Sequence, residues 1–306
     1  MGELEQQIFF LMSTGLSLNK IKEKLNLPDQ MFLKALKSLK QFHQFHDKDY
    51  YDTGEIFYNR PQKKRDDESR HHRLHMGNNK LRVLFISDLH CGNMKDNLGL
   101  LNQLYEYAIT QNIHVIINTG DFIENIYHLE ERKLREKTVM GQIRRAIKLY
   151  PYAPQIINLN LYGNHDQYSL KEDGINVGEI IEQERYDLVF LGYGEAYIDV
   201  LDDYFALQHN LINKSHQRLS EDTKLVFKGH SHKTKYDVRD GEAHIYVPTL
   251  SDAYPAMTGF KCQRGFLDVE IVFDLEGKMD RVYIQNFIIE KKPSLASEFV
   301  LSLKKK

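Results

Sequence analysis

Acidic, imidazole and amide side chains recur along this chain where short apolar runs end. Two pairs, Asp88 with His90 and His230 with His232, have an i, i+2 spacing that lets both side chains reach one side of an extended segment. The carboxylate of Asp121 has two oxygens with which it can bridge two metals. Oxygen and imidazole ligands in this number suit two divalent first-row metals. The complete set of such side chains is Asp88, His90, Asp121, Asn164, His165, His209, His230 and His232.

The stretch Leu-Tyr-Gly-Asn-His-Asp at residues 161–166 concentrates this chemistry. It ends an apolar run, residues 155–161, that predicts a buried strand. An amide, an imidazole and a carboxylate then stand side by side where a sheet opens to solvent, which is where α/β sheets bind ligands. For this stretch taken alone, the alternative is an ordinary polar turn.

The elements before this stretch predict how the side chains meet. Residues 82–87 and 113–118 are predicted strands, and residues 98–111 between them are a predicted helix. Such a βαβ unit makes the two strands parallel with a right-handed crossover. Asp88, His90 and Asp121 should therefore emerge at the same edge of a sheet. A further helix, about 130–149, leads to the strand before Asn164, which should end at that edge too.

The later part of the chain is richer in strands. A short helix at 177–183 is followed by strands at 188–191 and 225–228, and a hairpin joins 196–201 to 204–208. Two more hairpins are predicted around Asp240-Gly241 and Glu276-Gly277. This order predicts an α/β fold, a four-layer α-β-β-α sandwich of two mixed sheets with helices outside.

The N-terminal part reads as a separate small module. Apolar stripes predict three helices, at about 5–14, 17–25 and 30–42, and residues 49–58 predict a hairpin around Gly54. Three helices and a hairpin resemble a winged helix-turn-helix domain. The 306 residues therefore divide into a helical, winged-helix-like domain at 1–60, a polar linker at 61–80 and a larger domain at 81–306. His71, His72 and His75 fall in the linker and are not expected to hold metal.

The third predicted helix places lysines opposite its apolar stripe. Between residues 20 and 40 there are six basic residues against two acidic ones, a local excess that favours contact with DNA phosphates. The candidate contacts are Lys34, Lys37 and Lys40. The alternative is a solvated face on a module that packs against the second domain or another copy of the chain, forming a homodimer.

Composition limits the setting in which the protein works. The net charge of −2 and the pI of about 6.7 give the whole chain no nucleic-acid-like basic excess. Two cysteines, Cys91 and Cys262, suit a reducing compartment. No apolar run reaches about 18 residues, and the acidic N-terminus lacks the basic region of a signal peptide. We expect a cytoplasmic protein without a membrane partner.

Taken in order, the motifs resemble those of the calcineurin-like metallophosphoesterase superfamily. Its signature D-x-H, G-D, G-N-H-D/E, a lone His and G-H-x-H is matched over about residues 81–290. The matching residues are Asp88-Leu89-His90, Gly120-Asp121, Gly163-Asn164-His165-Asp166, His209 and Gly229-His230-Ser231-His232.

The resemblance implies a role for each of these residues. Three residues, Asp88, His90 and His232, would hold a first metal. Three others, Asn164, His209 and His230, would hold a second, with Asp121 as the bridge. His165 would act as general acid or charge stabiliser, and Asp166 would orient it. The lone histidine is assigned to His209, which ends a predicted strand, in preference to His216 in a polar stretch. The expected cofactors are two divalent ions, Mn²⁺ first, with Fe or Zn as alternatives.

The resemblance implies a metal-dependent phosphoesterase in which a hydroxide generated at the metals attacks phosphorus in line. The N-terminal module favours a nuclease-like phosphodiesterase acting on nucleic acid. Against this, residues 122–125 after Asp121 lack the Pro-Ser segment that often follows in repair nucleases. The alternatives are a small-molecule phosphodiesterase or phosphomonoesterase with an N-terminal oligomerisation module, and a DNA-binding regulator with structural metals.

Overall fold

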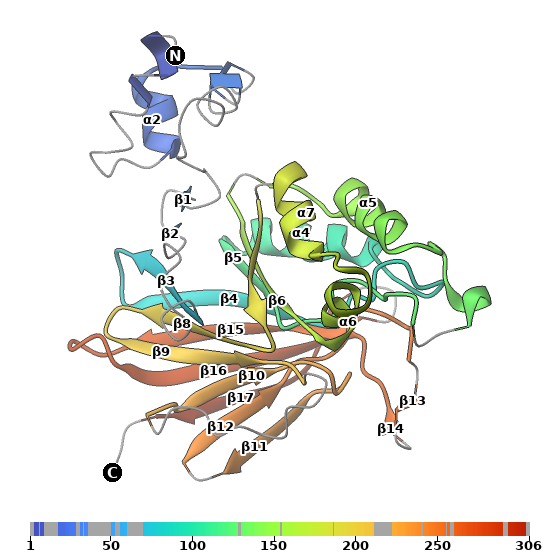
Figure 1. The fold of residues 1–306 in the computed structure, drawn as a ribbon. Coiled ribbons are helices and arrows are strands. Elements are labelled where there is room, and N and C mark those ends of the chain that lie inside the picture. The colour runs from blue at the N-terminus through green and yellow to red at the C-terminus, as the bar shows by residue number, and fades with distance from the viewer. Residues whose placement is uncertain are drawn as a thin grey trace.

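The computed structural model has two large sheets with helices packed on one of them (Figure 1). It describes residues 3–5, 7–8, 18–28, 31–32, 34–35, 50–52, 56–59, 70–127, 130–153, 155–185, 187–210, 222–239, 241–254, 256–257, 260–289 and 293–303. No helix in this part of the chain is long and apolar enough to cross a membrane.

The first sheet has seven strands in the order β17-β16-β15-β4-β5-β6-β7. Its strands are β4 (Lys80–Ile86), β5 (Val115–Asn118), β6 (Ile157–Tyr162), β7 (Leu188–Tyr193), β15 (Gly265–Phe273), β16 (Met279–Ile289) and β17 (Pro293–Ser302). Strands β4 to β7 are parallel, whereas β15, β16 and β17 add antiparallel strands on the other side of β4. The parallel arrangement of β4, β5 and β6 predicted from the βαβ pattern is confirmed.

The second sheet has eight strands in the order β1-β2-β3-β8-β9-β10-β12-β11. Its strands are β1 (Tyr50–Asp52), β2 (Ile56–Asn59), β3 (His71–Met76), β8 (Glu195–Val200), β9 (Asp203–Gln208), β10 (Leu225–Lys228), β11 (Lys235–Arg239) and β12 (Glu242–Tyr246). It is also mixed, since β9, β10 and β12 run parallel while β8 and β9 form the predicted hairpin. A short pair, β13 (Ala256–Met257) with β14 (Phe260–Lys261), lies apart from both sheets.

Apolar side chains from both sheets meet in one core. The ring of Phe85 on β4 stacks on Phe227 of β10 at 3.7 Å and meets Phe205 of β9 edge-on at 6.0 Å. A second apolar cluster joins the other face of the seven-stranded sheet to the helices, with Leu84 packed among Leu101 and Ile143. The predicted α/β sandwich of two mixed sheets is confirmed.

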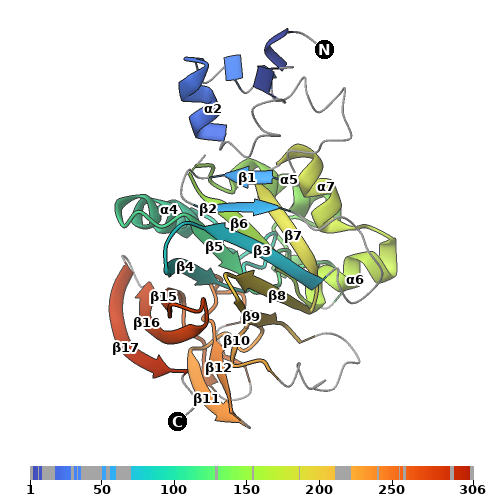
Figure 2. The same cartoon turned by 90° about the vertical axis from the view of Figure 1, so that its left-hand side faces the viewer.

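The helices that follow residue 98 lie on the side of the seven-stranded sheet (Figures 1 and 2). They are α4 (Gly99–Thr110), the 3₁₀ turn η3 (Glu131–Lys133), α5 (Val139–Leu149), α6 (Asn164–Asp173) and α7 (Val177–Glu184). The helix predicted at 130–149 is thus shorter, because Thr138 caps α5 by accepting the backbone N–H of Gly141 at 3.0 Å. Helix α6 begins at Asn164, where the sequence predicted only a turn.

The linker predicted at 61–80 is wrong over its last ten residues. Residues 71–76 form β3, which pairs in parallel with β8, and β4 begins at Lys80. The side chains of His72 and Leu74 are buried, and His72 contacts the Tyr58 hydroxyl at 2.7 Å and the carbonyl of Leu191 at 3.0 Å. Three histidines made this alternating strand read as polar, although one of them faces the core.

The N-terminal module is described in part. Helix α2 (Leu18–Lys24) matches the second predicted helix, and β1 with β2 forms the predicted hairpin. That hairpin continues into the eight-stranded sheet, since β2 pairs with β3. Lys34 is exposed, whereas Lys37, Lys40 and His216 lie outside the described residues. The winged-helix resemblance and the division at residue 60 stay predictions.

Candidate functional site

The polar residues singled out from the sequence come together where strands of both sheets end. The loops after β4 and β5 carry Asp88, His90 and Asp121, and the first turn of α6, after β6, carries Asn164 and His165. The loops after β9 and β10 carry the three later histidines. The two sheets are tied at this point, because the backbone N–H of His230 donates to Asp88 Oδ2 at 3.1 Å.

Three groups of side chains at this edge have ligand atoms close enough to hold a metal ion. They are Asp88 with His90 and His232, Asp121 with His209 and His230, and His90 with Asp121 and His165. In the first, Asp88 Oδ1 lies 3.2 Å from His232 Nε2. In the second, Asp121 Oδ2 lies 3.1 Å from His209 Nε2. The amide oxygen of Asn164 faces the second group, 3.0 Å from His230 Nδ1.

Five of these residues have a backbone that only glycine adopts readily. Their φ angles are 53° at Asp88, 47° at His90, 54° at Asp121, 71° at His230 and 54° at His232. A non-glycine residue in the left-handed region costs about 1–3 kcal/mol and persists only where its surroundings enforce it. Strain of this kind concentrates at functional sites, and here five candidate metal ligands at one edge carry it.

Two glycines of the motifs let the strand ends approach one another. Gly120 has a φ of 123°, and a Cβ there would lie 2.3 Å from His209 Nδ1. A Cβ on Gly163 would lie 2.1 Å from Asp121 Oδ1. Both distances are below any tolerable contact, so an alanine at either place would push an imidazole or the central carboxylate out of position.

Backbone carbonyls fix the orientation of two imidazoles. His209 Nδ1 donates to the carbonyl of Thr119 at 2.8 Å, and His165 Nδ1 donates to that of Glu124 at 2.6 Å. A carbonyl only accepts, so the proton must sit on Nδ1 in each ring. Nε2 of each ring then faces Asp121 Oδ2, at 3.1 Å for His209 and 3.9 Å for His165.

The electrostatics of the cluster suit cations. Burial opposes ionisation of both carboxylates, yet His232 lowers the pKa of Asp88 and His209 lowers that of Asp121. Burial also disfavours charged imidazoles, but Asp121 raises the pKa of His209 to about 9 and Asp88 raises that of His232 to about 10. The protons on these two imidazoles thus neutralise the charge of the buried carboxylates. A divalent cation would take the place of those protons.

Unsatisfied atoms support the same fit. Asp88 Oδ1 and His209 Nε2 are buried and make no hydrogen bond within the described part of the chain, although each has an ion-pair partner, His232 Nε2 at 3.2 Å and Asp121 Oδ2 at 3.1 Å. A buried polar atom without a hydrogen bond is costly unless a charge neutralises it. Carboxylate oxygens and imidazole nitrogens are the donors that divalent first-row metals take, so the residues present fit a metal centre.

Asp166 has a different role from the one expected. Its carboxylate accepts the backbone N–H groups of Phe122 at 3.1 Å, Ile123 at 3.0 Å and Gly163 at 2.8 Å. The Glu124 carbonyl, and not this carboxylate, accepts the imidazole proton of His165. Asp166 therefore ties the loop after β5 to the start of α6, and the assignment of Asp166 as the group that orients the ring of His165 is corrected.

Sequence reasoning missed two side chains at the cluster. Glu124 is buried, and its Oε2 lies 3.1 Å from His90 Nδ1. The ring of Tyr254 lies 4.9 Å from that of His90. A carboxylate three residues after Asp121 was a signal that could have been weighed, whereas Tyr254 lies in no motif.

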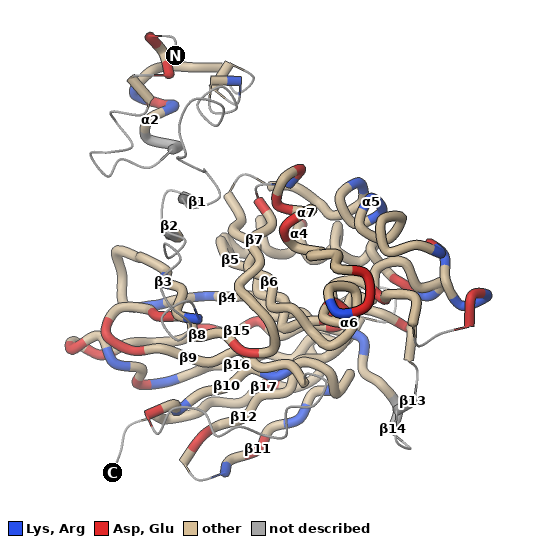
Figure 3. Tube along the Cα trace, in the orientation of Figure 1, with Lys and Arg blue, Asp and Glu red and all other residues tan. Residues whose placement is uncertain are grey.

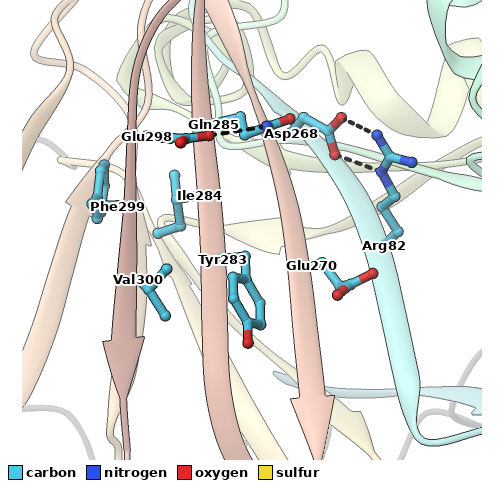
Figure 4. A pocket seen from close by; sticks show the side chains of 9 residues that line it. All are labelled: Arg82, Asp268, Glu270, Tyr283, Ile284, Gln285, Glu298, Phe299 and Val300. Atoms are coloured by element: carbon cyan, nitrogen blue, oxygen red, sulfur yellow. Dashed lines mark hydrogen bonds and ion pairs between the residues drawn. The ribbon is translucent and has the colours of Figure 1, made fainter.

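A hollow of about 570 Å³ on the outer face of β4, β15, β16 and β17 is separate from this cluster (Figure 4). Its lining residues are Arg82, Asp268, Glu270, Tyr283, Ile284, Gln285, Glu298, Phe299 and Val300. The arginine holds Asp268 through two hydrogen bonds, of 2.9 and 2.7 Å. Because the charge of Arg82 is already neutralised and none of the metal-ligating residues lines the hollow, we place the chemistry at the cluster.

Several solved structures are similar to this one. A phosphodiesterase from an archaeon is 17% identical, with a TM-score of 0.41 over 68% of this chain and 100% of that chain. The phosphoesterase Yfce from E. coli is 16% identical, with a TM-score of 0.41 over 73% of this chain and 100% of that chain. Vacuolar protein sorting 29 from Cryptosporidium parvum is 14% identical, with a TM-score of 0.43 over 74% of this chain and 100% of that chain. No curated protein matches the chain.

The sequence of the larger domain also matches a family model, that of the calcineurin-like phosphoesterase superfamily domain, over residues 81–253. This match spans more than half of the chain and contains every strand end that carries a side chain of the cluster. Because this family model covers more than half of the chain and the clustered imidazoles and carboxylates can hold metal, the chain belongs to the calcineurin-like phosphoesterase superfamily and is a metal-dependent phosphoesterase.

Proposed function

We propose that the protein hydrolyses phosphodiester bonds, with nucleic acid as the substrate, at a centre for two divalent metals. The observation that carries the proposal is the sharing of Asp121 between metal-ligating groups. It joins His209 and His230 in one group and His90 and His165 in another. One carboxylate between two sets of imidazoles is the arrangement that a dinuclear centre requires.

We assign the ligands of the two metals as the motifs of the superfamily imply. Asp88, His90 and His232 hold the first metal in our proposal, and Asn164, His209 and His230 hold the second. Asp121 would supply a carboxylate to both. When bound, the divalent metals, with Mn²⁺ as the expected ion, polarise a phosphoryl oxygen and lower the pKa of the attacking water.

His165 supplies the proton for the leaving oxygen. Burial lowers the pKa of this imidazole, but Asp121 and Glu124 outweigh burial and raise it above its ordinary value. This shift favours the protonated ring, and its Nδ1 is already held by the Glu124 carbonyl. Nε2 is left facing the centre, in the position of a general acid.

The N-terminal residues support nucleic acid as the substrate. Lys22 and Lys24 stand in the last turn of α2, and Lys34 is exposed. Lysines of this kind neutralise phosphates without reading sequence. Acidic side chains lie instead on α6 and α7 (Figure 3), so we expect a polyanion to approach from another side.

Replacing the bridging carboxylate tests the activity. Asp121→Ala should abolish Mn²⁺-dependent hydrolysis of bis-p-nitrophenyl phosphate and of linear DNA, because both metal groups lose a ligand. The control is Glu298→Ala, a carboxylate of the outer hollow, which should keep full activity. Near-native hydrolysis by Asp121→Ala would refute the dinuclear mechanism.

The same assays, applied to the native protein with different substrates, distinguish between the substrate classes. Faster turnover of linear DNA than of the small diester supports the nucleic-acid assignment. Turnover confined to bis-p-nitrophenyl phosphate or to the monoester p-nitrophenyl phosphate would instead point to a small-molecule phosphoesterase.

A further inference from the structure

Glu124 is a buried carboxylate whose neighbours belong to the cluster although it belongs to none of the three metal-ligating groups. Only 1% of its surface is exposed. Its Oε2 lies 3.1 Å from His90 Nδ1 and accepts a hydrogen bond from Asn93 Nδ2, also at 3.1 Å. A charge so deeply buried is costly unless it is paired and hydrogen-bonded, so these contacts decide where it sits.

The same carboxylate stands between two imidazoles with different roles. Oε2 faces His90, a ligand of the first metal in the proposed centre. Oε1 lies 3.5 Å from Nδ1 of His165, the proposed general acid. A carboxylate on Nδ1 of His90 strengthens Nε2 of that ring as a ligand. Nδ1 of His165 is instead held by the backbone carbonyl of Glu124 at 2.6 Å.

The hydroxyl of Tyr254 is hydrogen-bonded to Oε1 of Glu124, the carboxylate oxygen that faces His165. Tyr254 donates through this hydroxyl to Glu124 Oε1 at 2.5 Å, while its ring lies 4.9 Å from that of His90, 5.6 Å from that of His232 and 5.9 Å from that of His165. The phenol thus reaches the carboxylate from the side of the first metal group and closes that side of the cluster.

The segment that carries Tyr254 is anchored to the loop of the first ligand. Thr249 Oγ1 donates to the carbonyl of Asp88 at 2.9 Å, and the backbone N–H of Leu250 donates to the carbonyl of Ser87 at 3.0 Å. Farther along the chain, the thiol of Cys262 donates to the backbone carbonyl of Tyr254 at 2.5 Å. The phenol is therefore fixed relative to Asp88.

We propose that Tyr254 is a positioning residue that directs the carboxylate of Glu124 to His90. Tyr254 thereby sets the affinity of Asp88, His90 and His232 for the first metal ion. The phenol satisfies Oε1, which leaves Oε2 for His90 Nδ1, while His165 Nδ1 already donates to the Glu124 carbonyl at 2.6 Å. Nε2 of His90 is then presented to the centre, 3.9 Å from Asp88 Oδ1. This inference rests on the ligand assignment of the proposed function.

Removing the hydroxyl while keeping the ring tests the inference. Tyr254→Phe should bind one Mn²⁺ with native affinity and the other about 10–100-fold more weakly, the usual effect of losing a partner behind a metal ligand. Mn²⁺ titration by calorimetry measures the affinities, and electron paramagnetic resonance reports whether two coupled ions are present. Tyr236→Phe, an exposed phenol on β11, is the matched control and should bind as the native protein does.

A double-mutant cycle separates positioning from a general structural role. Glu124→Gln should weaken the same metal, and Glu124→Gln with Tyr254→Phe should weaken it no further, because the hydroxyl acts through the carboxylate. Additive losses, or native Mn²⁺ affinity in Tyr254→Phe, would overturn the inference. Circular dichroism checks that each variant is folded, and Tyr254→Phe should recover the native rate at saturating Mn²⁺ if positioning is its role.

The two proposals fail in different ways. If Asp121→Ala keeps activity, the dinuclear centre itself is wrong. If Asp121→Ala loses metal and activity while Tyr254→Phe binds both metals normally, the centre stands and only the role of Tyr254 is wrong.

Discussion

His165 lies farther from Asp121 than His209 does, at about the distance of His90, whose Nε2 is 4.0 Å from Oδ2. The Nε2 of His165 stays 3.9 Å away, whereas that of His209 lies at 3.1 Å. We expect His165→Ala to keep both metals and to lose about 10²–10⁴-fold in kcat, the usual contribution of general acid catalysis. Metal content and kcat measured on the same preparation check this.

The outcome also decides between two roles that the geometry allows. His165 belongs to one of the three metal-ligating groups, with His90 and Asp121. Loss of one metal equivalent from His165→Ala would place this ring among the ligands. His90→Ala, which should lose a metal, is the comparison that shows the assay can detect such a loss.

Residue types and spacing were enough to find the cluster, but not its support. Asp88, Asp121 and the histidines are recognisable because few side chains hold metals and their motifs end strands. Glu124 and Tyr254, which act through those ligands in our proposal, come from loops where no spacing rule identifies them. Asp166 was assigned to an imidazole, yet its carboxylate accepts three backbone N–H groups, and a sequence does not show which donors lie nearby.

Strand β12 carries a histidine whose titration should affect stability. His244 is 8% exposed, and burial together with Lys228 and Arg239 lowers its pKa to about 4, although Glu242 Oε2 lies 3.3 Å from Nε2. In the unfolded chain this imidazole has an ordinary pKa of about 6.5. Between pH 6.5 and 4 it is therefore protonated in the unfolded chain and neutral in the folded chain. The contribution of His244 to stability is therefore complete above pH 6.5 and is lost as the pH falls toward 4.

His244→Gln removes this titration. The urea midpoint of the variant should fall less between pH 7 and pH 5 than that of the native protein. His71→Gln is the control, because that ring is exposed on β3. An equal fall in His244→Gln and in the native protein would show that other groups cause the acid sensitivity.

Elements with a strong local pattern were predictable, and those defined by tertiary pairing were not. The buried parallel strands β4, β5 and β6 show as apolar runs, and α4 and α7 show as periodic helices. Strand β3 was missed because its pairing partner β8 is far along the chain and its histidines read as polar. Strand β17 was not predicted, since most of its side chains are exposed and leave no apolar alternation.

The whole molecule places a limit on which N-terminal residues can be removed. Strands β1, β2 and β3 extend the eight-stranded sheet, and Tyr58 and Leu74 lie in the core between the sheets. A chain beginning at residue 49 keeps these strands and should hydrolyse the small diester at the native rate. A chain beginning at residue 79 loses them, exposes the core and should aggregate or melt at a lower temperature.

The chain beginning at residue 49 also tests the N-terminal lysines. We expect it to bind DNA less tightly than the full chain at low salt, and the deficit should shrink at high salt, because phosphate contacts release counterions. Lys34→Glu in the full chain should act in the same direction. Unchanged DNA binding together with a change from dimer to monomer would make the N-terminal residues an assembly device and favour a small-molecule substrate.

Strand β4 pairs with a strand from late in the chain, so the seven-stranded sheet cannot be completed until late in synthesis. Strand β4 pairs on one side with β5, but on the other with β15, where Leu267 lies opposite Phe85. Once His232 has emerged from the ribosome, every ligand of the proposed centre has been synthesised. At that point one edge of β4 is still unpaired, because β15 has not yet emerged. Pairings between distant segments form slowly and leave edges exposed to aggregation. A nascent chain should therefore depend on chaperones until its last hairpin emerges, and a stop codon after His232 should yield all the ligands and no enzyme.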